Sequence, residues 1–312
     1  MNRTSVAFMA IVLNAGLAWA QGPVNERKPA PHDGTVKITD LAGSVRVSGW
    51  DRDSVAIRGA LGEGVERLEF STDERATRIR VLMKREYRGK LVTGSDLEIR
   101  VPRQSHVAVR TGTGAIGLSD VSGAVDLESA DGTIRVEGAP RFVYARSVGG
   151  AVEVAGLSKV VRASSVSGRV TIRRAAGYVE ASTVSGDVRL SGRGLWEGEV
   201  TTVSGDIGFD GSFDRGGSFS FETSSGAIEI GLPSWMGADI DIVTYSGSIT
   251  NDLEPDAKPV RSANGPRREL VFSTAGGGTR LAIRTFKGAV HLLRSEGGRA
   301  SGGDGGGGSG SP

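Results

Sequence analysis

The sequence predicts an all-β fold, a parallel β-solenoid with turns of 18–21 residues that is preceded by an N-terminal β region. Three observations lead to this prediction. Short words of the type SVSGRV, TVSGDV and TVSGDI recur at nearly constant spacing. Apolar and polar residues alternate on both sides of each word, which is typical of half-buried strands. The 48 glycines follow no Gly-X-Y period, which excludes collagen. The general handedness of parallel crossovers further predicts right-handed turns.

The glycine of each word marks one turn of the predicted solenoid. The first eight markers are separated by 18, 18, 18, 18, 19, 21 and 21 residues, and the ninth follows 41 residues later, close to two further turns. A β-branched apolar residue lies two positions after every marker, as a pleated strand favours. Stacking the turns about 4.8 Å apart would bury apolar residues that a single turn leaves exposed. The markers are Gly114, Gly132, Gly150, Gly168, Gly186, Gly205, Gly226, Gly247 and Gly288.

A hydroxyl residue lies three positions before every marker. These residues share the phase of the inward apolar positions, so we expect a column at the rim of the core. There the hydroxyls would bond to one another or to the bent backbone. Nine equivalent nucleophiles without a recurring histidine do not form a catalytic site, so we interpret the column as structural. Its members are Thr111, Ser129, Ser147, Ser165, Thr183, Thr202, Thr223, Thr244 and Thr285.

Residues 1–20 have the features of a cleaved secretory signal. Arg3 precedes a mostly apolar stretch that ends at Leu17, and Ala18-Trp19-Ala20 offers a small-x-small cleavage site. The alternative is a membrane anchor, but Asn14 interrupts the stretch, which is shorter than the roughly 20 residues of a spanning helix. No later segment is apolar enough to span a membrane. We therefore expect export to the periplasm or cell surface, without a transmembrane segment in the mature chain.

Composition divides the rest of the chain into four parts. We expect a flexible, proline-rich leader at 21–33 and the N-terminal β region at 34–103. The solenoid would occupy 104–293, with a polar inserted loop at 251–268. The glycine-rich tail at 294–312 has nothing to bury, so we expect it to be disordered.

Charge and rare residues exclude several functions. The 38 basic and 36 acidic residues give a net charge of +2 without a long basic run, so we expect no nucleic-acid partner. KREYRGK at 84–90 reads as a solvated loop. No cysteine exists to form a disulfide or carry a lipid. His32, His106 and His291 lack metal-ligand spacing, so we expect neither a metal nor a cofactor.

One pair of carboxylates merits consideration as a reactive site. Asp187 and Asp206 occupy equivalent positions in adjacent turns, where they could hold a hard cation or cleave a glycoside. Elsewhere the same column contains Ala, Thr and Arg, and Arg169 lies one turn from Asp187. We therefore interpret them as a solvated turn pair and predict no catalytic residues. A hexapeptide-type acyltransferase is excluded, because its helix needs an apolar residue at every sixth position.

Aromatic residues supply the candidate binding site. Trp196, Phe213 and Trp235 fall in the lengthened second corner of successive turns. Aromatic rings along one edge could stack on sugar rings or on a partner surface. The alternative is that they cover the wider end of the core, as the neighbouring Leu195 and Met236 suggest.

Three groups of residues carry a family resemblance. GSVRVSGWDRDSV near the start, DLEIRVP before the repeats, and the recurring SVSGRV, TVSGDV and TVSGDI words resemble the putative-adhesin family of bacterial secreted β-strand-repeat proteins, a domain of unknown function. The resemblance covers approximately residues 34–293. It implies an exported or cell-envelope β-repeat protein and supplies no catalytic residues.

The leading functional hypothesis is an exported, noncatalytic cell-envelope or surface protein, adhesin-like, that presents a rigid solenoid to an envelope glycan or protein. One alternative is a polysaccharide lyase or hydrolase on a β-helix, which would depend on Asp187 and Asp206. Another is a protein-docking platform in envelope assembly or the envelope stress response.

Overall fold

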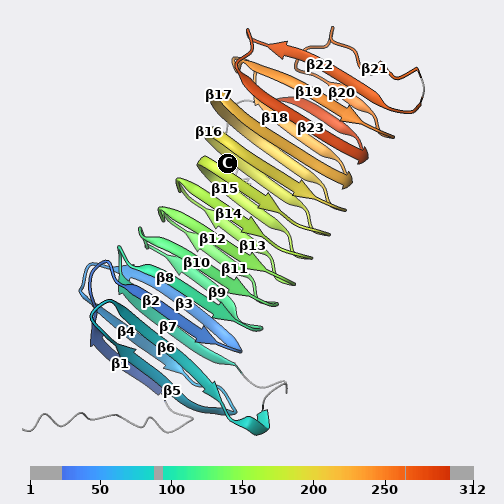
Figure 1. Ribbon diagram of the computed structural model, residues 1–312. Coiled ribbons are helices and arrows are strands. Elements are labelled where there is room, and N and C mark those ends of the chain that lie inside the picture. Colours follow the sequence, from blue (N-terminus) through green and yellow to red (C-terminus); the bar gives the residue numbers. More distant parts are fainter. Residues whose placement is uncertain (1–22, 88–93, 264, 296–312) are drawn as a thin grey trace, which may run out of the picture.

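The computed structural model describes residues 23–87, 94–263 and 265–295, which form an elongated stack of β-strands (Figure 1). The described residues contain one 3₁₀ helix, η1 (Arg85–Tyr87), and no α-helix. Each rung of the stack has one strand before its marker glycine and one after it. The strands before the markers build one face, called face A here, and the strands after them build the opposite face, called face B. The two faces enclose one hydrophobic core.

The central strands pair in parallel with the equivalent strands of the neighbouring rungs. Val125 lies opposite Val107 on one side and Val143 on the other. Val188 likewise lies between Val170 and Ile207, as the repeat predicts. The strands are β8 (His106–Thr111), β10 (Ala124–Ser129), β12 (Phe142–Ser147) and β14 (Val160–Ser164) on face A; β9 (Ala115–Ser119), β11 (Ile134–Glu137) and β13 (Val152–Ala155) on face B; and β15 (Val170–Ser182), β16 (Val188–Thr202) and β17 (Ile207–Ser225), which run through the second corner from face B to face A.

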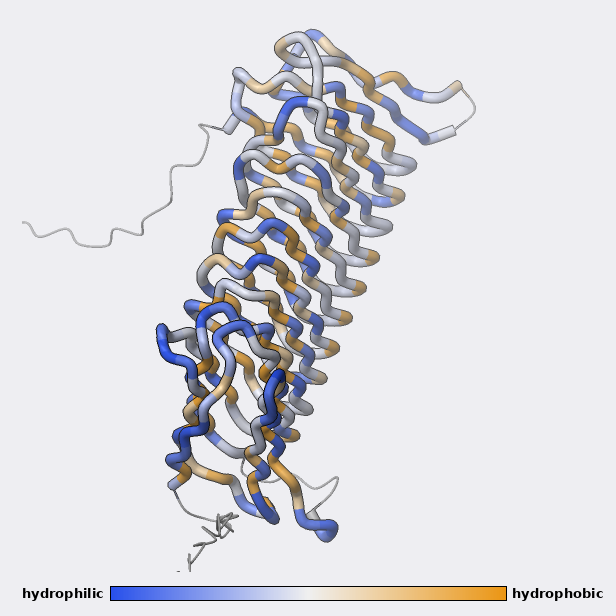
Figure 2. The backbone as a smooth tube through the Cα atoms, turned by 60° about the vertical axis from the view of Figure 1, so that its left-hand side comes forward, coloured by the Kyte–Doolittle hydropathy of each residue, from blue (hydrophilic) through white to orange (hydrophobic). Residues whose placement is uncertain are grey.

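Alternation along each strand places the apolar residues inside the stack. Figure 2 shows hydrophobic and hydrophilic positions alternating along the tube. Val125, Val143 and Val161 are fully buried on face A, as small β-branched side chains suit a pleated sheet. Toward the C-terminal end larger rings fill a wider interior. Phe209, Phe213, Phe219 and Phe221 form one cluster there, with ring centroids 4.2 to 6.5 Å apart.

The N-terminal end extends the parallel stack. Strands β2 and β3 pair in parallel with β8 and β9, and on their other side with β6 and β7. Residues 35–50 therefore form a rung of the stack, whereas the sequence predicted that the stack would begin at residue 104. The strands are β2 (Thr35–Asp40), β3 (Gly43–Trp50), β6 (Ala76–Met83) and β7 (Ser95–Pro102).

Three antiparallel strands close this end of the molecule. On face A, β5 (Val65–Thr72) pairs with β6. On face B, β4 (Ser54–Ala60) pairs with β7, and β1 (Pro23–Pro29) pairs with β4. The leader expected to be flexible is therefore ordered from Pro23 to Pro29. Pro23 and Pro29 stand at the ends of this edge strand, where prolines are tolerated, and Val24 is buried.

At the C-terminal end the order of rungs departs from the order of the chain. Strands β23 and β24 lie between the rung of β17 and β18 and the rung of β19 and β20. Gly288 therefore follows Gly226 in the stack, and Gly247 comes last. The inserted rung has partner strands on both sides, so the end of the described chain is held within the stack. The strands are β18 (Ile228–Pro233), β19 (Ala238–Thr244), β20 (Ile249–Asn251), β23 (Thr279–Lys287) and β24 (Val290–Ser295).

The segment 251–268 is only partly a loop. Within it, β21 (Val260–Arg261) pairs antiparallel with the first two residues of β22 (Arg268–Thr274), and β22 pairs antiparallel with β19. Leu253 is buried against the core. The predicted insertion therefore contributes a short hairpin to the end of face A.

The hydroxyl column bonds chiefly to backbone. Thr183 Oγ1 accepts from the Gly186 N–H at 3.1 Å and donates to the Gly168 carbonyl at 3.2 Å. Ser165 makes the equivalent bonds to Gly168 N–H and Gly150 carbonyl. Thr111 Oγ1 also lies 2.9 Å from Ser129 Oγ, a bond between hydroxyls. Each such hydroxyl thus connects the marker glycine of its own rung to the marker of the previous rung.

Thr183→Val is expected to lower the free energy of unfolding by about 1–3 kcal/mol, because it leaves the Gly186 N–H and the Gly168 carbonyl buried without their partner. Thr183→Ser keeps the hydroxyl and is expected to lose much less. Chemical denaturation of the three proteins measures the difference. Equal losses in the valine and serine variants would contradict the proposed role of the hydroxyl.

Candidate functional site

Outward side chains of face A form rows along the stack, because in-register strands place equivalent residues about 4.8 Å apart. One such row crosses four successive rungs. Tyr144 on β12 lies opposite Arg162 on β14, which lies opposite Glu180 on β15. Tyr178 lies two residues before Glu180 on β15, opposite Val160, so the row is continued diagonally by Tyr178 and by Trp196 on β16. We call Tyr144, Arg162, Tyr178 and Trp196 the aromatic row.

Arg162 holds the first three rungs of the row together. Its guanidinium carbon lies 5.5 Å from the Tyr144 ring centroid and 5.4 Å from that of Tyr178, within the range of cation–π attraction. Its Nη1 donates to the Tyr144 hydroxyl at 3.2 Å, and its Nε lies 2.9 Å from a carboxylate oxygen of Glu180. Hydrogen bonding to Tyr178 raises the pKa of Arg162, so this side chain stays cationic. The row therefore combines the exposed rings of Tyr144 and Trp196 and the half-buried ring of Tyr178 with a cation that is paired with Glu180.

A bulge in β16 directs Trp196 outward. Leu195 pairs with Gly177 and Glu197 pairs with Tyr178, so Trp196 is the extra residue between two paired positions. Bulges of this kind re-aim a side chain. Leu195 is fully buried, whereas the Trp196 side chain is 48% exposed. Its ring centroid lies 6.2 Å from that of Tyr178.

The three aromatic residues predicted from the sequence have different surroundings. Phe213 is buried, with its ring centroid 4.6 Å from Phe209 and 4.2 Å from Phe219, so it covers the wide core and is not available to a ligand. Trp235 lies in the turn between β18 and β19 and is 69% exposed. Among the described residues, the ring contact found for Trp196 is to Tyr178 and not to either of the other two. The structure thus joins Trp196 to Tyr144 and Tyr178, which the sequence reasoning missed.

A second exposed row follows the corner at the marker glycines. Seven large apolar side chains stand two positions before a marker or, in the first rung, before Gly43, and each is about half exposed. The backbone beneath them is bonded from rung to rung, as from Val166 N–H to the Val148 carbonyl. The valine of the recurring VSG words was the available sequence signal for Val166, Val184 and Val203. This apolar ridge consists of Leu41, Val148, Val166, Val184, Val203, Tyr245 and Phe286.

The two candidate carboxylates of the repeat connect rungs. Asp187 Oδ1 accepts from the Asp206 backbone N–H at 3.2 Å, and its Oδ2 lies 3.2 Å from the Arg169 guanidinium. Asp206 Oδ1 accepts from the Ala227 N–H at 2.8 Å. Each carboxylate therefore caps the backbone of the next rung, which is a structural use of the pair.

The remaining candidates lie apart. His106 and His291 are exposed on β8 and β24, and His32 lies 3.9 Å from Asp33. Within residues 23–87, 94–263 and 265–295, no cluster of three or more acidic or histidine side chains could hold a metal ion. Of the basic stretch 84–90, residues 85–87 form η1, and residues 88–90 lie outside the described residues.

Residues 93–269, more than half of the chain, match the family model described as Toastrack DUF4097. The chain belongs to this family. The match confirms the resemblance to a β-strand-repeat family of unknown function that the repeated words indicate. No curated protein matches this Toastrack chain.

Several solved structures share low similarity with this Toastrack chain. A putative adhesin from Parabacteroides merdae ATCC 43184 is 10% identical with a TM-score of 0.46, over 87% of this chain and 96% of that one. A putative adhesin from Parabacteroides distasonis ATCC 8503 is 11% identical with a TM-score of 0.44, over 87% and 97%. A putative lipid binding protein from the same strain is 11% identical with a TM-score of 0.40, over 87% and 96%.

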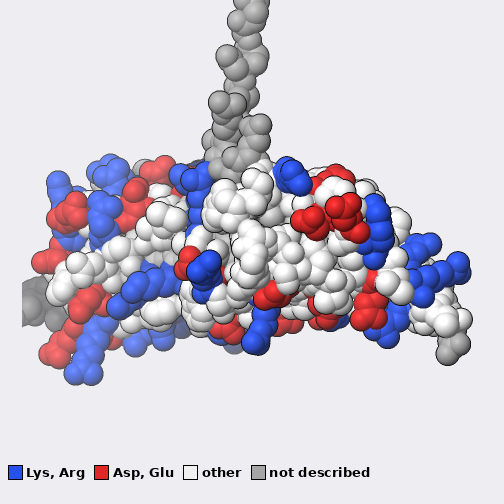
Figure 3. Space-filling view, turned by 90° about the horizontal axis from the view of Figure 1, so that it is seen from above, with Lys and Arg blue, Asp and Glu red and all other residues white. Residues whose placement is uncertain are grey.

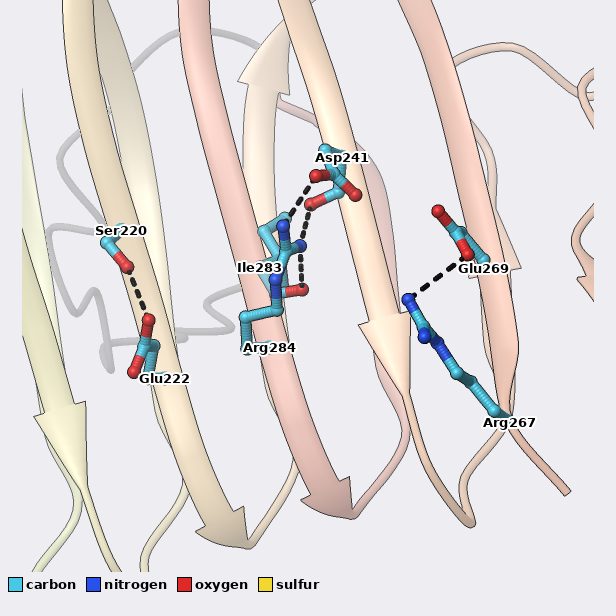
Figure 4. A network of polar contacts seen from close by, with 7 residues as sticks. All are labelled: Ser220, Glu222, Asp241, Arg267, Glu269, Ile283 and Arg284. Atoms are coloured by element: carbon cyan, nitrogen blue, oxygen red, sulfur yellow. Dashed lines mark hydrogen bonds and ion pairs between the residues drawn. The ribbon is translucent and has the colours of Figure 1, made fainter. Parts of the chain in front are cut away.

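Charged side chains of the Toastrack chain are widely paired along its faces. Arg110 lies 3.1 Å from Glu128 and Arg135 lies 3.1 Å from Glu153, each pair joining adjacent rungs. Figure 4 shows polar contacts near the C-terminal end of face A: Arg284 joins adjacent strands through Asp241, whereas Arg267 contacts Glu269 and Ser220 donates to Glu222 two residues away along the chain. Exposed pairs contribute at most about 1 kcal/mol each.

None of the described segments is a helix with the length and hydrophobicity needed to cross a membrane.

Proposed function

We propose that this Toastrack protein is an exported, noncatalytic cell-envelope or surface protein that binds an envelope glycan along the aromatic row. The observation that supports the proposal is the chain of contacts that joins Tyr144, Arg162, Tyr178 and Trp196 across four rungs. Exposed tyrosine and tryptophan rings present an apolar surface and a polar group together, which suits the mixed surface of a sugar. The stacking direction gives a linear polymer successive contacts at regular intervals.

The scaffold and the location are parts of the same proposal. We infer a right-handed β-solenoid with turns of 18–21 residues as the rigid support, in agreement with the parallel registers. Residues 1–20 act as a cleaved signal that sends the chain to the periplasm or the cell surface, although they lie outside the described residues. Sequencing the N-terminus of the protein recovered from cell fractions tests this, with Gln21 as the expected first residue.

Trp196→Ala and Tyr178→Ala are each expected to weaken glycan binding about ten-fold, which is a typical loss for a central aromatic contact. The measurement is retention of the folded protein on a panel of envelope polysaccharides and peptidoglycan, with unfolded protein as the background. Tyr245→Ala is the matched control, because Tyr245 is 46% exposed but lies on the apolar ridge. If the protein is retained specifically but the Trp196 and Tyr178 variants are retained equally well, the aromatic row is not the binding site. If no polysaccharide retains the folded protein specifically, glycan binding is refuted.

The apolar ridge favours a second function, a protein-docking platform in envelope assembly or stress response. Single exposed apolar residues are ordinary on proteins, but Val148, Val166, Val184 and Val203 stand in four successive rungs, and a patch of this kind marks an interaction surface. Val166→Asp together with Val184→Asp would remove a protein partner captured from the native envelope, while leaving glycan retention unchanged. If the double variant still captures the protein partner, the ridge has no docking role.

A polysaccharide lyase or hydrolase has less support, because Asp187 and Asp206 each accept a backbone hydrogen bond. A reducing-end assay on a polysaccharide panel, repeated with both residues changed to asparagine, tests this alternative. Activity lost in the double variant would overturn the noncatalytic proposal.

A further inference from the structure

Strand β22 is the outermost long strand at the C-terminal end of face A (Figure 1). All seven of its residues pair with β19 on the inner side. On the outer side, within the part of the chain that the structure describes, only Arg268 and Glu269 have strand partners, in β21. In an antiparallel ladder alternate residues direct their N–H and C=O groups to the other side. The backbone from Leu270 to Thr274 therefore presents hydrogen-bonding groups at an edge without a neighbouring described strand.

At the opposite end of the stack, the edge strand of face B is protected against strand addition. Strand β1 begins with Pro23 and ends with Pro29. The Lys28 ammonium donates to the carbonyl of Phe70 in β5 and lies 4.9 Å from the centre of the Phe70 ring. Prolines and lysines are the residues with which natural sheets block their edges. Strand β22, with the sequence RELVFST, contains neither. Strand β22 therefore lacks the protection that β1 has.

A pocket of about 450 Å³ lies where β21 stops pairing with β22. Val260 and Val271 line it and are 71% and 67% exposed. Three cations, Lys258, Arg261 and Arg267, also line it, against a single carboxylate, Glu269. Arg267 lies 3.3 Å from Glu269, and this pair leaves two cationic side chains in excess. In the view onto this end, Lys and Arg side chains gather at the right (Figure 3).

We propose that β22 accepts an extended acidic segment of a partner protein as an added strand. The segment continues the line of β21 along Leu270–Thr274, with an apolar side chain between Val260 and Val271 and acidic side chains against Lys258 and Arg261. Main-chain hydrogen bonds provide affinity in this mode of binding, and a pocket for alternate side chains provides specificity. The edge favours a polypeptide over a glycan or a lipid, because only an extended backbone repeats donors and acceptors in the same pattern. This site is separate from the aromatic row and independent of glycan binding.

The test uses the mature chain and a short labelled peptide that alternates valine and glutamate, with lysine replacing glutamate in a second peptide. Fluorescence anisotropy is expected to show binding of the acidic peptide only, and to weaken as salt is added. Amide hydrogen exchange is expected to slow between residues 270 and 274 when the acidic peptide binds. Equal binding of the two peptides, or unchanged exchange in β22 at saturation, would overturn the proposal.

Two sets of variants locate the binding site. Val271→Lys places a charge at the strand edge, and the double variant Lys258→Glu with Arg261→Glu reverses the charge of the pocket. Each is expected to weaken binding of the acidic peptide at least about ten-fold. Leu157→Lys in the turn between β13 and β14 and Arg173→Glu on β15 are matched controls with exposed positions elsewhere, and they are expected to bind normally. The double reversal leaves the strand unchanged, so it still tests the site if Val271→Lys fails to fold. Full binding by the folded variants would show that the peptide binds elsewhere and would overturn the proposal. Self-association of the peptide-free chain that Val271→Lys abolishes would instead identify a second copy of this chain as the occupant of the edge.

Discussion

Gly205→Ala is expected to lower the free energy of unfolding by about 3 kcal/mol or more, near the upper end of what overpacking costs. A Cβ on Gly205 would meet the carbonyl oxygen and carbon of Gly186 at well under 3.0 Å, a separation that real Cβ atoms do not show. Gly186 belongs to a rung paired on both sides, so its backbone cannot withdraw without breaking ladder hydrogen bonds. The marker glycines are thus required by the close approach of successive rungs.

Two other glycines separate this clash from the other effects of the substitution. Gly216 has a φ of +78° with nothing within 4 Å of an added Cβ, so Gly216→Ala is expected to cost only the strain of the left-handed conformation, about 1–2 kcal/mol. Gly265 has open space and no such φ, so its alanine variant is expected to stay within about 0.5 kcal/mol of the parent. Denaturant midpoints of the three variants give the order. A Gly205→Ala protein as stable as Gly216→Ala would show that close approach does not explain the markers.

The sequence was sufficient to predict each central rung and its register. A glycine at constant spacing and apolar residues at fixed positions around it define the rung locally, since the side-chain period of a strand is two. Val170, Val188 and Ile207 form the expected column. The hydroxyl column also lies at the expected depth, with Thr183 bonded to backbone of two rungs.

The order of the end rungs could not be read from the same pattern. Rungs with similar inner faces present similar edges, so spacing along the chain does not determine which rung lies next to which. Gly288 therefore lies between Gly226 and Gly247 in the stack, although it follows both in the chain. The rung at residues 35–50 is inserted in the same way between β6/β7 and β8/β9.

The candidate site could be predicted only in part for a related reason. Alternation assigns a side chain to the inside or the outside until a bulge interrupts it. Leu195 and Trp196 are adjacent at such a bulge, and one is buried while the other is exposed. Phe213 pairs with Leu195 and is directed inward with it. A lengthened corner in the sequence gives no indication of which aromatic residue will face the solvent.

Asp40→Thr is expected to stabilise the protein at pH 8 by about 2–4 kcal/mol. Asp40 lies three positions before Gly43, where later rungs have a hydroxyl residue, and it pairs with Thr111 of the next rung. The side chain is 1% exposed, and its Oδ2 has no hydrogen-bond partner among the described residues. Its Oδ1 accepts a long bond, 3.4 Å, from the Ala42 N–H. A carboxylate here is buried with little compensation.

The sign of the pH dependence follows from the pKa of this carboxyl. Burial raises the pKa of Asp40 from 3.8 to about 7. Below pH 3.8 both the folded and the unfolded chain hold the proton, and the full stability is present. Between pH 3.8 and about 7 the unfolded chain has lost a proton that the folded chain retains, so stability falls as pH rises. At about 1.4 kcal/mol for each pH unit, the loss is on the order of 4 kcal/mol and is complete above pH 7.

Threonine restores the hydroxyl of the column and cannot ionise, so Asp40→Thr is expected to remove the fall in stability between pH 4 and 7 while changing little at pH 4. Denaturant unfolding at a series of pH values measures it. Asp51→Asn is the control: hydrogen bonding to Arg103 lowers the pKa of the exposed Asp51, so its removal leaves the fall intact. A loss of stability at pH 8 in Asp40→Thr would show that the ionised carboxylate is needed at the start of the column. The buried charge would then be a requirement of the first rung instead of a cost that later rungs avoid with a hydroxyl.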